Sequence, residues 1–202
     1  MDQSQIAALP LAEKAAIFIR AYEGFTDKAM WDVNAYRIGH GSDTITNADG
    51  TFRKVKEHDT TTREAALRDL MRRIRTEFIP RLQNQLGSAT YNALPWPAIV
   101  GLLSLSYNYG SITKQSIITA ARTLDTSLLA DTVINATYND NKSQPVNVQN
   151  ELHKRRAEEA AFIRMGKSSG SSSGVDLGIV VPVIAIASLF AFKTLQQNKQ
   201  AA

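Results

Sequence analysis

An amphipathic helix that runs straight into a glycine-containing, strand-like segment is the feature that most constrains the fold of this chain. Over residues 11–22, apolar side chains form one stripe at helical spacing, and charged side chains take the other side. The stretch 31–44 then reads as strand and turn. We therefore expect an α+β domain that is mostly helical and carries a small β-sheet.

Turn and cap signals predict where the strands and the helix in the middle of the chain begin and end. The run N-A-D-G at 47–50 is a hairpin turn signal, so strands are expected at 43–46 and 51–55. The run T-T-R-E at 61–64 is a capping box that begins a helix, and Pro80 is expected to interrupt that helix near its end. Three arginines opposite the apolar stripe of this helix are expected on a solvated face rather than in a glycan-binding patch: Arg68, Arg72 and Arg75.

A central buried helix is expected next. Pro97 is placed to begin it, where the missing N–H does no harm, and Gly110 is placed to end it. Residues 98–105 between them are apolar almost all round. Trp31 and Trp96 are expected to be buried, with stacking on a sugar ring as the alternative. The last helices are expected at 116–124, 127–137 and 148–165.

Two carboxyl groups stand in unlike settings, Glu23 at the end of the opening helix and Asp32 on the loop that follows. The last turn of a helix exposes unpaired carbonyls at the negative end of its dipole, which disfavours a carboxylate. Tyr22 and Phe25 would add desolvation, so Glu23 is expected to keep its proton near neutral pH. A protonated acid beside an ionised carboxylate is the pairing that glycoside cleavage requires.

This stretch resembles the start of the phage-type lysozymes and their lytic transglycosylase relatives. In that family a catalytic glutamate ends the first helix and a T-I-G-x-G-like signature follows, which here reads R-I-G-H-G at 37–41. Downstream, Y-N-Y-G at 107–110 is similar to the family's aromatic-Asn-x-Gly segment, and 152–162 to its late L-x-x-R-R-x-x-E helix. The resemblance covers residues 11–166 and implies a lysozyme-like fold that cleaves the MurNAc–GlcNAc bond of bacterial peptidoglycan.

The resemblance also implies roles for individual residues. Glu23 would be the general acid, and Asp32 would stabilise positive charge on the sugar or orient the nucleophile. His40 could bind sugar or tune Glu23, although a structural loop histidine is the simpler interpretation. The residues expected to bind substrate are Arg37, His40, Ser42, Thr44, Tyr107 and Asn108, the last two being equally compatible with capping and packing.

Two departures from the family pattern leave the fate of the intermediate open. Arg37 stands where the family's lysozymes usually carry a threonine that positions the attacking water, and Ser42 stands where they usually carry a histidine. Hydrolysis and transglycosylation, in which the sugar's own 6-hydroxyl attacks, therefore remain alternatives. A third alternative is an inactive wall-binding module of a virus particle, which the retention of both carboxylates disfavours.

The composition limits the classes of binding partner that the chain is expected to have. The 202 residues carry 23 basic and 19 acidic side chains, a net charge of +4 that suits an anionic cell wall but falls far below a nucleic-acid footprint. The chain has no cysteine, its three histidines share no metal-ligand spacing, and no glycine-rich phosphate loop is present. We expect peptidoglycan as the partner, with no cofactor, no metal and no nucleic acid.

The C-terminal part has a different composition. A domain at 1–166 is followed by a Gly/Ser linker at 167–176, an apolar stretch at 177–193 that carries no charge before Lys193, and a polar tail at 194–202. We expect the apolar stretch to be a short transmembrane helix rather than a helix of the core, because a tether precedes it. The protein would then be anchored in a virion membrane or the host inner membrane, where virion or membrane-complex proteins are possible partners.

Overall fold

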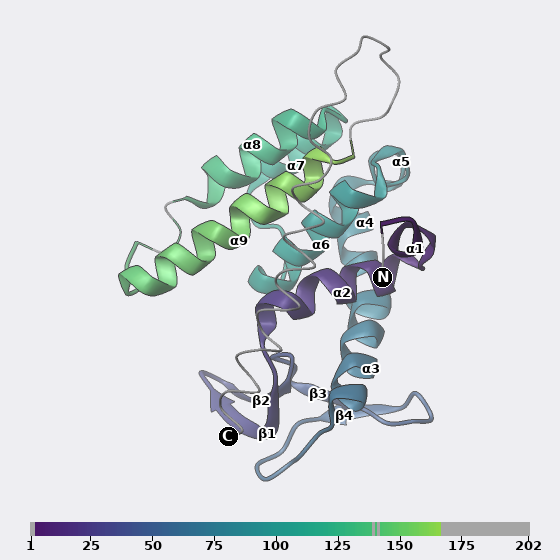
Figure 1. Ribbon diagram of the computed structural model, residues 1–202, viewed down its shortest axis with the longest axis vertical. Coiled ribbons are helices and arrows are strands. Elements are labelled where there is room, and N and C mark those ends of the chain that lie inside the picture. The colour runs from purple at the N-terminus through teal and green to yellow at the C-terminus, as the bar shows by residue number, and fades with distance from the viewer. Residues whose placement is uncertain (1–2, 139, 141, 167–202) are drawn as a thin grey trace.

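The computed structural model describes residues 3–138, 140 and 142–166 of the chain (Figure 1). The predicted α+β composition is confirmed, because these residues are mostly helical and include two small antiparallel sheets. In chain order the elements are α1 Gln3–Ala8, α2 Leu11–Glu23, β1 Thr26–Asp32, β2 Ala35–Gly39, β3 Thr44–Thr46, β4 Phe52–Lys54, α3 Arg63–Arg73, the π-helical turn η1 Ile74–Phe78, α4 Ile79–Leu86, α5 Ser88–Ala93, α6 Trp96–Tyr109, α7 Gln115–Arg122, α8 Thr126–Thr137 and α9 Val146–Arg164.

The helices and the sheets occupy different ends of the molecule. Figure 1 shows β1 to β4 gathered beyond the C-terminal end of α2, while α8 and α9 lie side by side at the opposite end. The helical rod made by α3, η1 and α4 runs between the two ends. The last residue of α2 therefore sits where the helical part meets the sheets, which is the position expected for Glu23.

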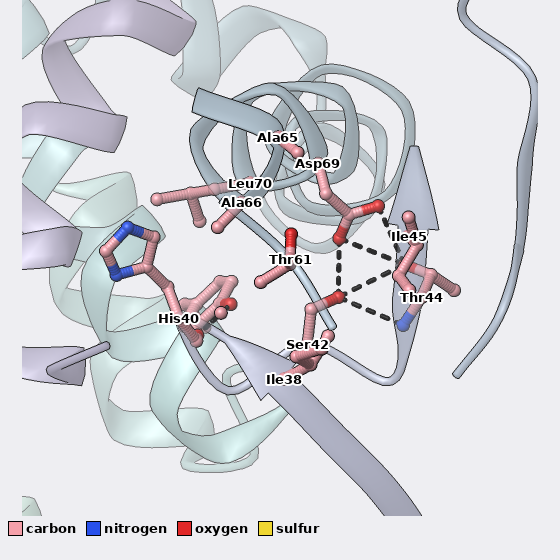
Figure 2. Close-up of a pocket in the computed structure, with 12 residues that line it drawn as sticks. Ile38, His40, Ser42, Thr44, Ile45, Thr61, Ala65, Ala66, Asp69 and Leu70 are labelled. Atoms are coloured by element: carbon pink, nitrogen blue, oxygen red, sulfur yellow. Dashed lines mark hydrogen bonds between the residues drawn. The ribbon is translucent and has the colours of Figure 1, made fainter. Parts of the chain in front are cut away.

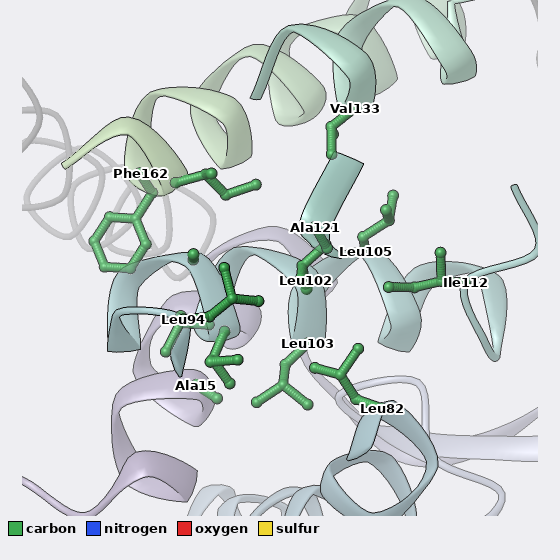
Figure 3. Close-up of a cluster of buried hydrophobic side chains, with 14 of the residues drawn as sticks. Ala15, Leu82, Leu94, Leu102, Leu103, Leu105, Ile112, Ala121, Val133 and Phe162 are labelled. Carbon is green, nitrogen blue, oxygen red and sulfur yellow. The ribbon is translucent and has the colours of Figure 1, made fainter. Parts of the chain in front are cut away.

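Helix α6 forms the centre of the hydrophobic core, as its apolar sequence predicts. Leu102 and Leu103 are fully buried and pack among apolar side chains from α2, α4, α8 and α9 (Figure 3). Gly101 lets α9 approach closely, because a Cβ atom there would lie 2.6 Å from Cγ1 of Ile163. Gly110 ends the helix with a left-handed backbone, as expected for a glycine C-cap.

Pro80 does not interrupt its helix in the way that the sequence predicts. Helix continues through η1 into α4, and Pro80 lies in the first turn of α4. The preceding turn widens to π geometry, so that the N–H of Ile79 reaches the carbonyl of Ile74. A proline supplies no N–H and crowds the turn before it, and a wider turn accommodates both effects. The buried side chains Ile74 and Leu82 hold the two halves of the rod in the core.

The sheets are two hairpins, of which the second was predicted and the first, made by β1 and β2, was not. In the second hairpin the turn at 47–50 is confirmed by a hydrogen bond from the N–H of Gly50 to the carbonyl of Asn47, and β3 pairs with β4 in antiparallel register. In the first hairpin, strand β1 extends as far as Asp32, which pairs with Ala35. Asp32 therefore ends a strand, beside a two-residue turn, rather than lying on a loop.

The backbone conformation and the packing of Gly39 explain why the first glycine of the R-I-G-H-G signature is needed. Its φ of 64° lies in the left-handed region, where a side chain is strained. A Cβ atom at this position would also lie 2.7 Å from Cβ of Ala66 on α3. Glycine is thus required both for the turn after β2 and for the close approach of that turn to α3.

The predicted membrane anchor cannot be placed on this fold. The linker at 167–176, the apolar stretch at 177–193 and the tail at 194–202 lie outside the described residues. Within the described ranges, no helix combines the length and the apolar character that a membrane span requires.

Candidate active site

Glu23 ends α2 and points toward α9 rather than toward the bulk solvent. Its side chain is only 18% exposed, and its Oε1 accepts a hydrogen bond from Nη1 of Arg155 at 2.7 Å. Gly41 faces its other oxygen, because a Cβ atom built on Gly41 would lie 3.7 Å from Oε2 of Glu23. Glu23 was expected to lie among aromatic side chains, whereas its hydrogen-bond partner in the structure is a guanidinium group.

Arg155 is buried behind Glu23 and contacts a second carboxylate. Its Nε donates to Oε1 of Glu159 at 3.1 Å, and its Nη2 donates to the carbonyl of Ser104 on α6 at 3.2 Å. Its guanidinium also lies 5.1 Å from the ring centre of Tyr22. Burial works to lower the pKa of Arg155, but Glu23 and Glu159 outweigh it and leave the pKa raised.

Glu159 is fully buried and forms the base of this network. Besides Arg155, its Oε1 accepts from Oγ of Ser104 at 2.6 Å and from Nη2 of Arg156 at 3.1 Å. Burial raises the pKa of Glu159, and the two guanidiniums oppose that change. Burial likewise lowers the pKa of Arg156. The resemblance includes Glu159 in a late helix motif, but the contact of that helix with Glu23 is a finding of the structure.

His40 fastens the turn that follows Glu23. Its Nδ1 lies 2.5 Å from the carbonyl of Gly24, and because a carbonyl only accepts, Nδ1 carries the proton. The carbonyl of His40 in turn accepts from the hydroxyl of Tyr107 at 2.8 Å. Burial lowers the pKa of His40 and raises that of Tyr107. These contacts agree with the structural interpretation of His40, and they give Tyr107 a packing role.

Ser42 and Thr44 are brought together by a buried carboxylate that the sequence analysis did not identify. Asp69 on α3 is 2% exposed and accepts from Oγ of Ser42 at 2.5 Å and from Oγ1 of Thr44 at 3.0 Å (Figure 2). Thr46 donates to the same group at 2.6 Å. The cavity beside this cluster measures about 10 Å³, which is room for one water molecule and not for a sugar ring.

This cluster, Ser42, Thr44, Thr46 and Asp69, holds β3 against α3. The predicted sugar contacts of Ser42 and Thr44 stay predictions, since both hydroxyls already have partners. A signal for Asp69 was present in the sequence, because residues 42, 44 and 46 put three hydroxyls on one face of a strand. A polar strand face that is covered by a helix needs a polar partner on that helix.

Arg72 is wrongly predicted to lie on a solvated face. Its Nε donates to Oγ1 of Thr46 at 2.9 Å and its Nη2 to Oγ1 of Thr44 at 2.8 Å, while its Nη1 donates to Glu77 at 2.8 Å. The β3–β4 hairpin covers this face of α3, so the arginine lies between the helix and the sheet. Arg68 also reaches the hairpin, because its Nε donates to the carbonyl of Thr46.

Arg37 lies near the second carboxylate of the predicted pair. Its Nε is 3.6 Å from Oδ2 of Asp32, whose side chain is largely exposed at the end of β1. On its other side, Nη1 of Arg37 is 3.9 Å from Oδ1 of Asp43. Burial alone would raise the pKa of Asp43, but Lys54, Arg73 and Arg37 hold it below the ordinary value. Asp32 and Arg37 thus extend an ion-pair series along the hairpin.

The described contacts do not bring all the predicted site residues to one point. Glu23 is held by α9, whereas Asp32 is paired with Arg37 of β2. Asn108 is exposed at the end of α6, where its Oδ1 accepts from Arg156 at 3.3 Å. Among the described residues, no group of three His, Asp or Glu side chains is arranged to hold a metal ion.

Trp31 is also wrongly predicted to be buried. It is 62% exposed and packs edge-on against Tyr36, its cross-strand neighbour, at 5.1 Å between ring centres. Trp96 is half-buried, with Phe162 against its edge and Nζ of Lys14 over its ring.

Comparison with known proteins found no match in family models or among curated proteins.

Proposed function

We propose that this protein is a muramidase with a lysozyme-like fold that cleaves the MurNAc–GlcNAc bond of bacterial peptidoglycan. The observation that carries the proposal is the setting of Glu23. Its carboxyl group ends α2 where the helices meet the sheets, is mostly shielded from water, is held by Arg155 and lies beside Gly41. A shielded and fixed carboxyl group with a glycine beside it is suited to meet a bulky substrate.

In the proposed reaction Glu23 is the general acid. Its proton passes to the glycosidic oxygen as the bond from that oxygen to the anomeric carbon of the sugar breaks, and Glu23 is left as the carboxylate. Positive charge develops on the sugar ring, and the exposed carboxylate of Asp32 stabilises it. In hydrolysis a water then attacks the anomeric carbon and its proton returns to the carboxylate of Glu23, so the acid is restored and the sum of the steps is addition of one water across the bond.

Transglycosylation is the second candidate, and Arg37 is the observation that favours it. At this position the resembled lysozymes usually carry a threonine that positions water, whereas the guanidinium of Arg37 lies between Asp32 and Asp43. An arginine has donors only and cannot accept a hydrogen bond from water as a threonine hydroxyl can. In this reaction the 6-hydroxyl of the same sugar attacks and its proton returns to the carboxylate of Glu23, which closes an anhydro ring and consumes no water.

The proposed substrate and location follow from the sequence. A net charge of +4 suits approach to an anionic wall, and the apolar stretch at 177–193 would tether the enzyme to a virion membrane or the host inner membrane. A bacterial virus that opens the wall during entry or exit is the setting we propose.

Digestion of purified sacculi tests the proposal. The protein is expected to release soluble muropeptides, and mass spectrometry of their ends distinguishes the two reactions, because anhydro ends lack one water. Protein that sediments with sacculi but releases no soluble sugar would contradict the proposal and support the wall-binding module instead. Protein that neither binds nor releases would exclude both.

A further inference from the structure

Arg155 connects two carboxyl groups that are far apart in the sequence. Nη1 donates to Glu23 at 2.7 Å, and Nε donates to Glu159 at 3.1 Å. One of these carboxyl groups is at the candidate site and the other is fully buried behind it. A single positive charge therefore serves two acids, so protonation of either acid changes how strongly Arg155 interacts with the other.

Stability alone does not account for this buried cluster. Oε2 of Glu159 and both Nε and Nη1 of Arg156 are buried and have no hydrogen-bond partner among the described residues. Buried ion pairs of this kind are often replaced by apolar side chains with no loss of stability. A function for the charge of Glu159 is therefore the more economical explanation.

We propose that Glu159 is a positioning residue that acts through Arg155 to set the pH above which Glu23 loses its catalytic proton, an inference that rests on the proposed function. When Glu23 is protonated, Glu159 still balances the charge of Arg155. Without the charge of Glu159, Arg155 would have Glu23 as its carboxylate partner, and the ionised form of Glu23 would be favoured.

Other charged and titratable groups surround Glu23 and Glu159, and the substitution Glu159→Gln leaves all of them in place. Helix α9 contributes Glu158, which accepts from the hydroxyl of Tyr22 at 2.7 Å, and Arg156. Electrostatic effects on Glu23, Glu159 or Arg155 come from Tyr22 of α2, His40 of the turn after β2, Tyr107 of α6 and Arg156 of α9. The groups that act in turn on these four include Arg20, Tyr109 and Glu158. A comparison between variants therefore isolates Glu159.

The first test is the pH profile of sacculus digestion. In Glu159→Gln, the limb on which activity falls as the pH rises should move to lower pH by about one unit, because a nearby charge has this order of effect. At a fixed pH on that limb the rate would fall about tenfold relative to the wild type. Glu158→Gln is the matched control, since it makes the same change one position away, and its profile should coincide with that of the wild type.

The second test does not depend on activity. The carboxyl carbon of Glu23 is followed by NMR in protein labelled at glutamate, with Glu23→Gln used to assign its signal. The midpoint of its pH titration should move to lower pH in Glu159→Gln and not in Glu158→Gln. Coupling is reciprocal, so the Glu159 signal should move in the same direction in Glu23→Gln, which also covers the case in which Glu159→Gln fails to fold.

The two tests separate this inference from the proposed function. The inference would be overturned if Glu23 titrates in Glu159→Gln as it does in the wild type, and Glu159 titrates in Glu23→Gln as it does in the wild type. This holds even if the wild type digests sacculi. Shifted titrations together with a wild type that releases nothing would uphold the coupling and reject the muramidase. A shifted pH profile that Glu158→Gln reproduces would also overturn the inference, because the shift would then follow from the loss of any nearby negative charge and not from Glu159 in particular.

Discussion

Nη1 of Arg155 lies 2.7 Å from Oε1 of Glu23, across 132 positions of sequence. The contact joins the late helix α9 to the end of α2 and gives the candidate acid a fixed orientation. Its position also makes it a structural element, since Arg155 is 7% exposed and Glu159 lies beneath it. Both the chemistry proposed for Glu23 and the packing of α9 thus depend on one guanidinium.

The substitution Arg155→Met should destabilise the fold strongly. It removes one of the two charged partners of Glu159 on α9 and leaves that carboxyl group buried with fewer donors. Breaking a buried ion pair in this way typically costs about 3–5 kcal/mol. The free energy of unfolding from urea titrations measures the effect. Arg164→Met is the matched control on the same helix, because Arg164 forms an exposed ion pair with Asp131 and should change stability by less than about 0.5 kcal/mol. Equal losses in the two variants would contradict a structural role for Arg155.

The substitution Asp69→Asn should loosen β3 from α3. An amide accepts fewer hydrogen bonds than a carboxylate and carries no charge for Arg72, so a loss of about 2–3 kcal/mol is expected. Amide hydrogen exchange at 42–46 should accelerate with it. Asp49→Asn, in the exposed turn of the same hairpin, is the control and should leave unfolding and exchange nearly unchanged. Unaltered exchange in Asp69→Asn would show that the hydroxyl cluster does not hold the strand.

His40 should make stability fall as the solution becomes more acidic. Burial lowers the pKa of His40, so the unfolded chain takes up this proton at a higher pH than the folded protein does. The free energy of unfolding should therefore decrease as the pH falls below about 6.5, by less than about 1.4 kcal/mol per pH unit for one proton. His40→Asn, whose amide can donate to Gly24, should reduce this slope, whereas His153→Gln should retain it. If the free energy of unfolding depends on pH as steeply in His40→Asn as in the wild type, the dependence comes from another group.

Local sequence rules predicted the elements well. The helices at 11–22, 116–124, 127–137 and 148–165 are found within two residues of their expected ends, and the hairpin turn at 47–50 is where it was expected. These features depend on helical periodicity, caps and turn residues, all of which act within a few positions. The capping box is nearly right, since Thr62 rather than Thr61 accepts the N–H of Ala65.

Contacts between distant segments were not predictable in the same way. Helical periodicity put Arg72 opposite the core, but it could not show that a hairpin covers that face. Hydrophobicity favoured burial of Trp31, although the ring stands near a hairpin tip beyond the reach of the core. The rule for Pro80 was overridden because Ile74 and Leu82 are anchored on either side of it. For the candidate site, the sequence pointed to Glu23 and His40, whose roles stay predictions, but it did not identify Asp69 as the partner of the hydroxyls.

The most direct measurement is the release of soluble muropeptides from purified sacculi by Glu23→Gln beside wild type, at equal concentration and with thermal unfolding checked for both. The matched control is Glu13→Gln, which makes the same change in the first turn of the same helix. Removal of a general acid should lower the rate at least about 100-fold in Glu23→Gln, while Glu13→Gln digests as the wild type does. A folded Glu23→Gln that releases muropeptides at the wild-type rate would contradict the assignment of Glu23 as the proton donor.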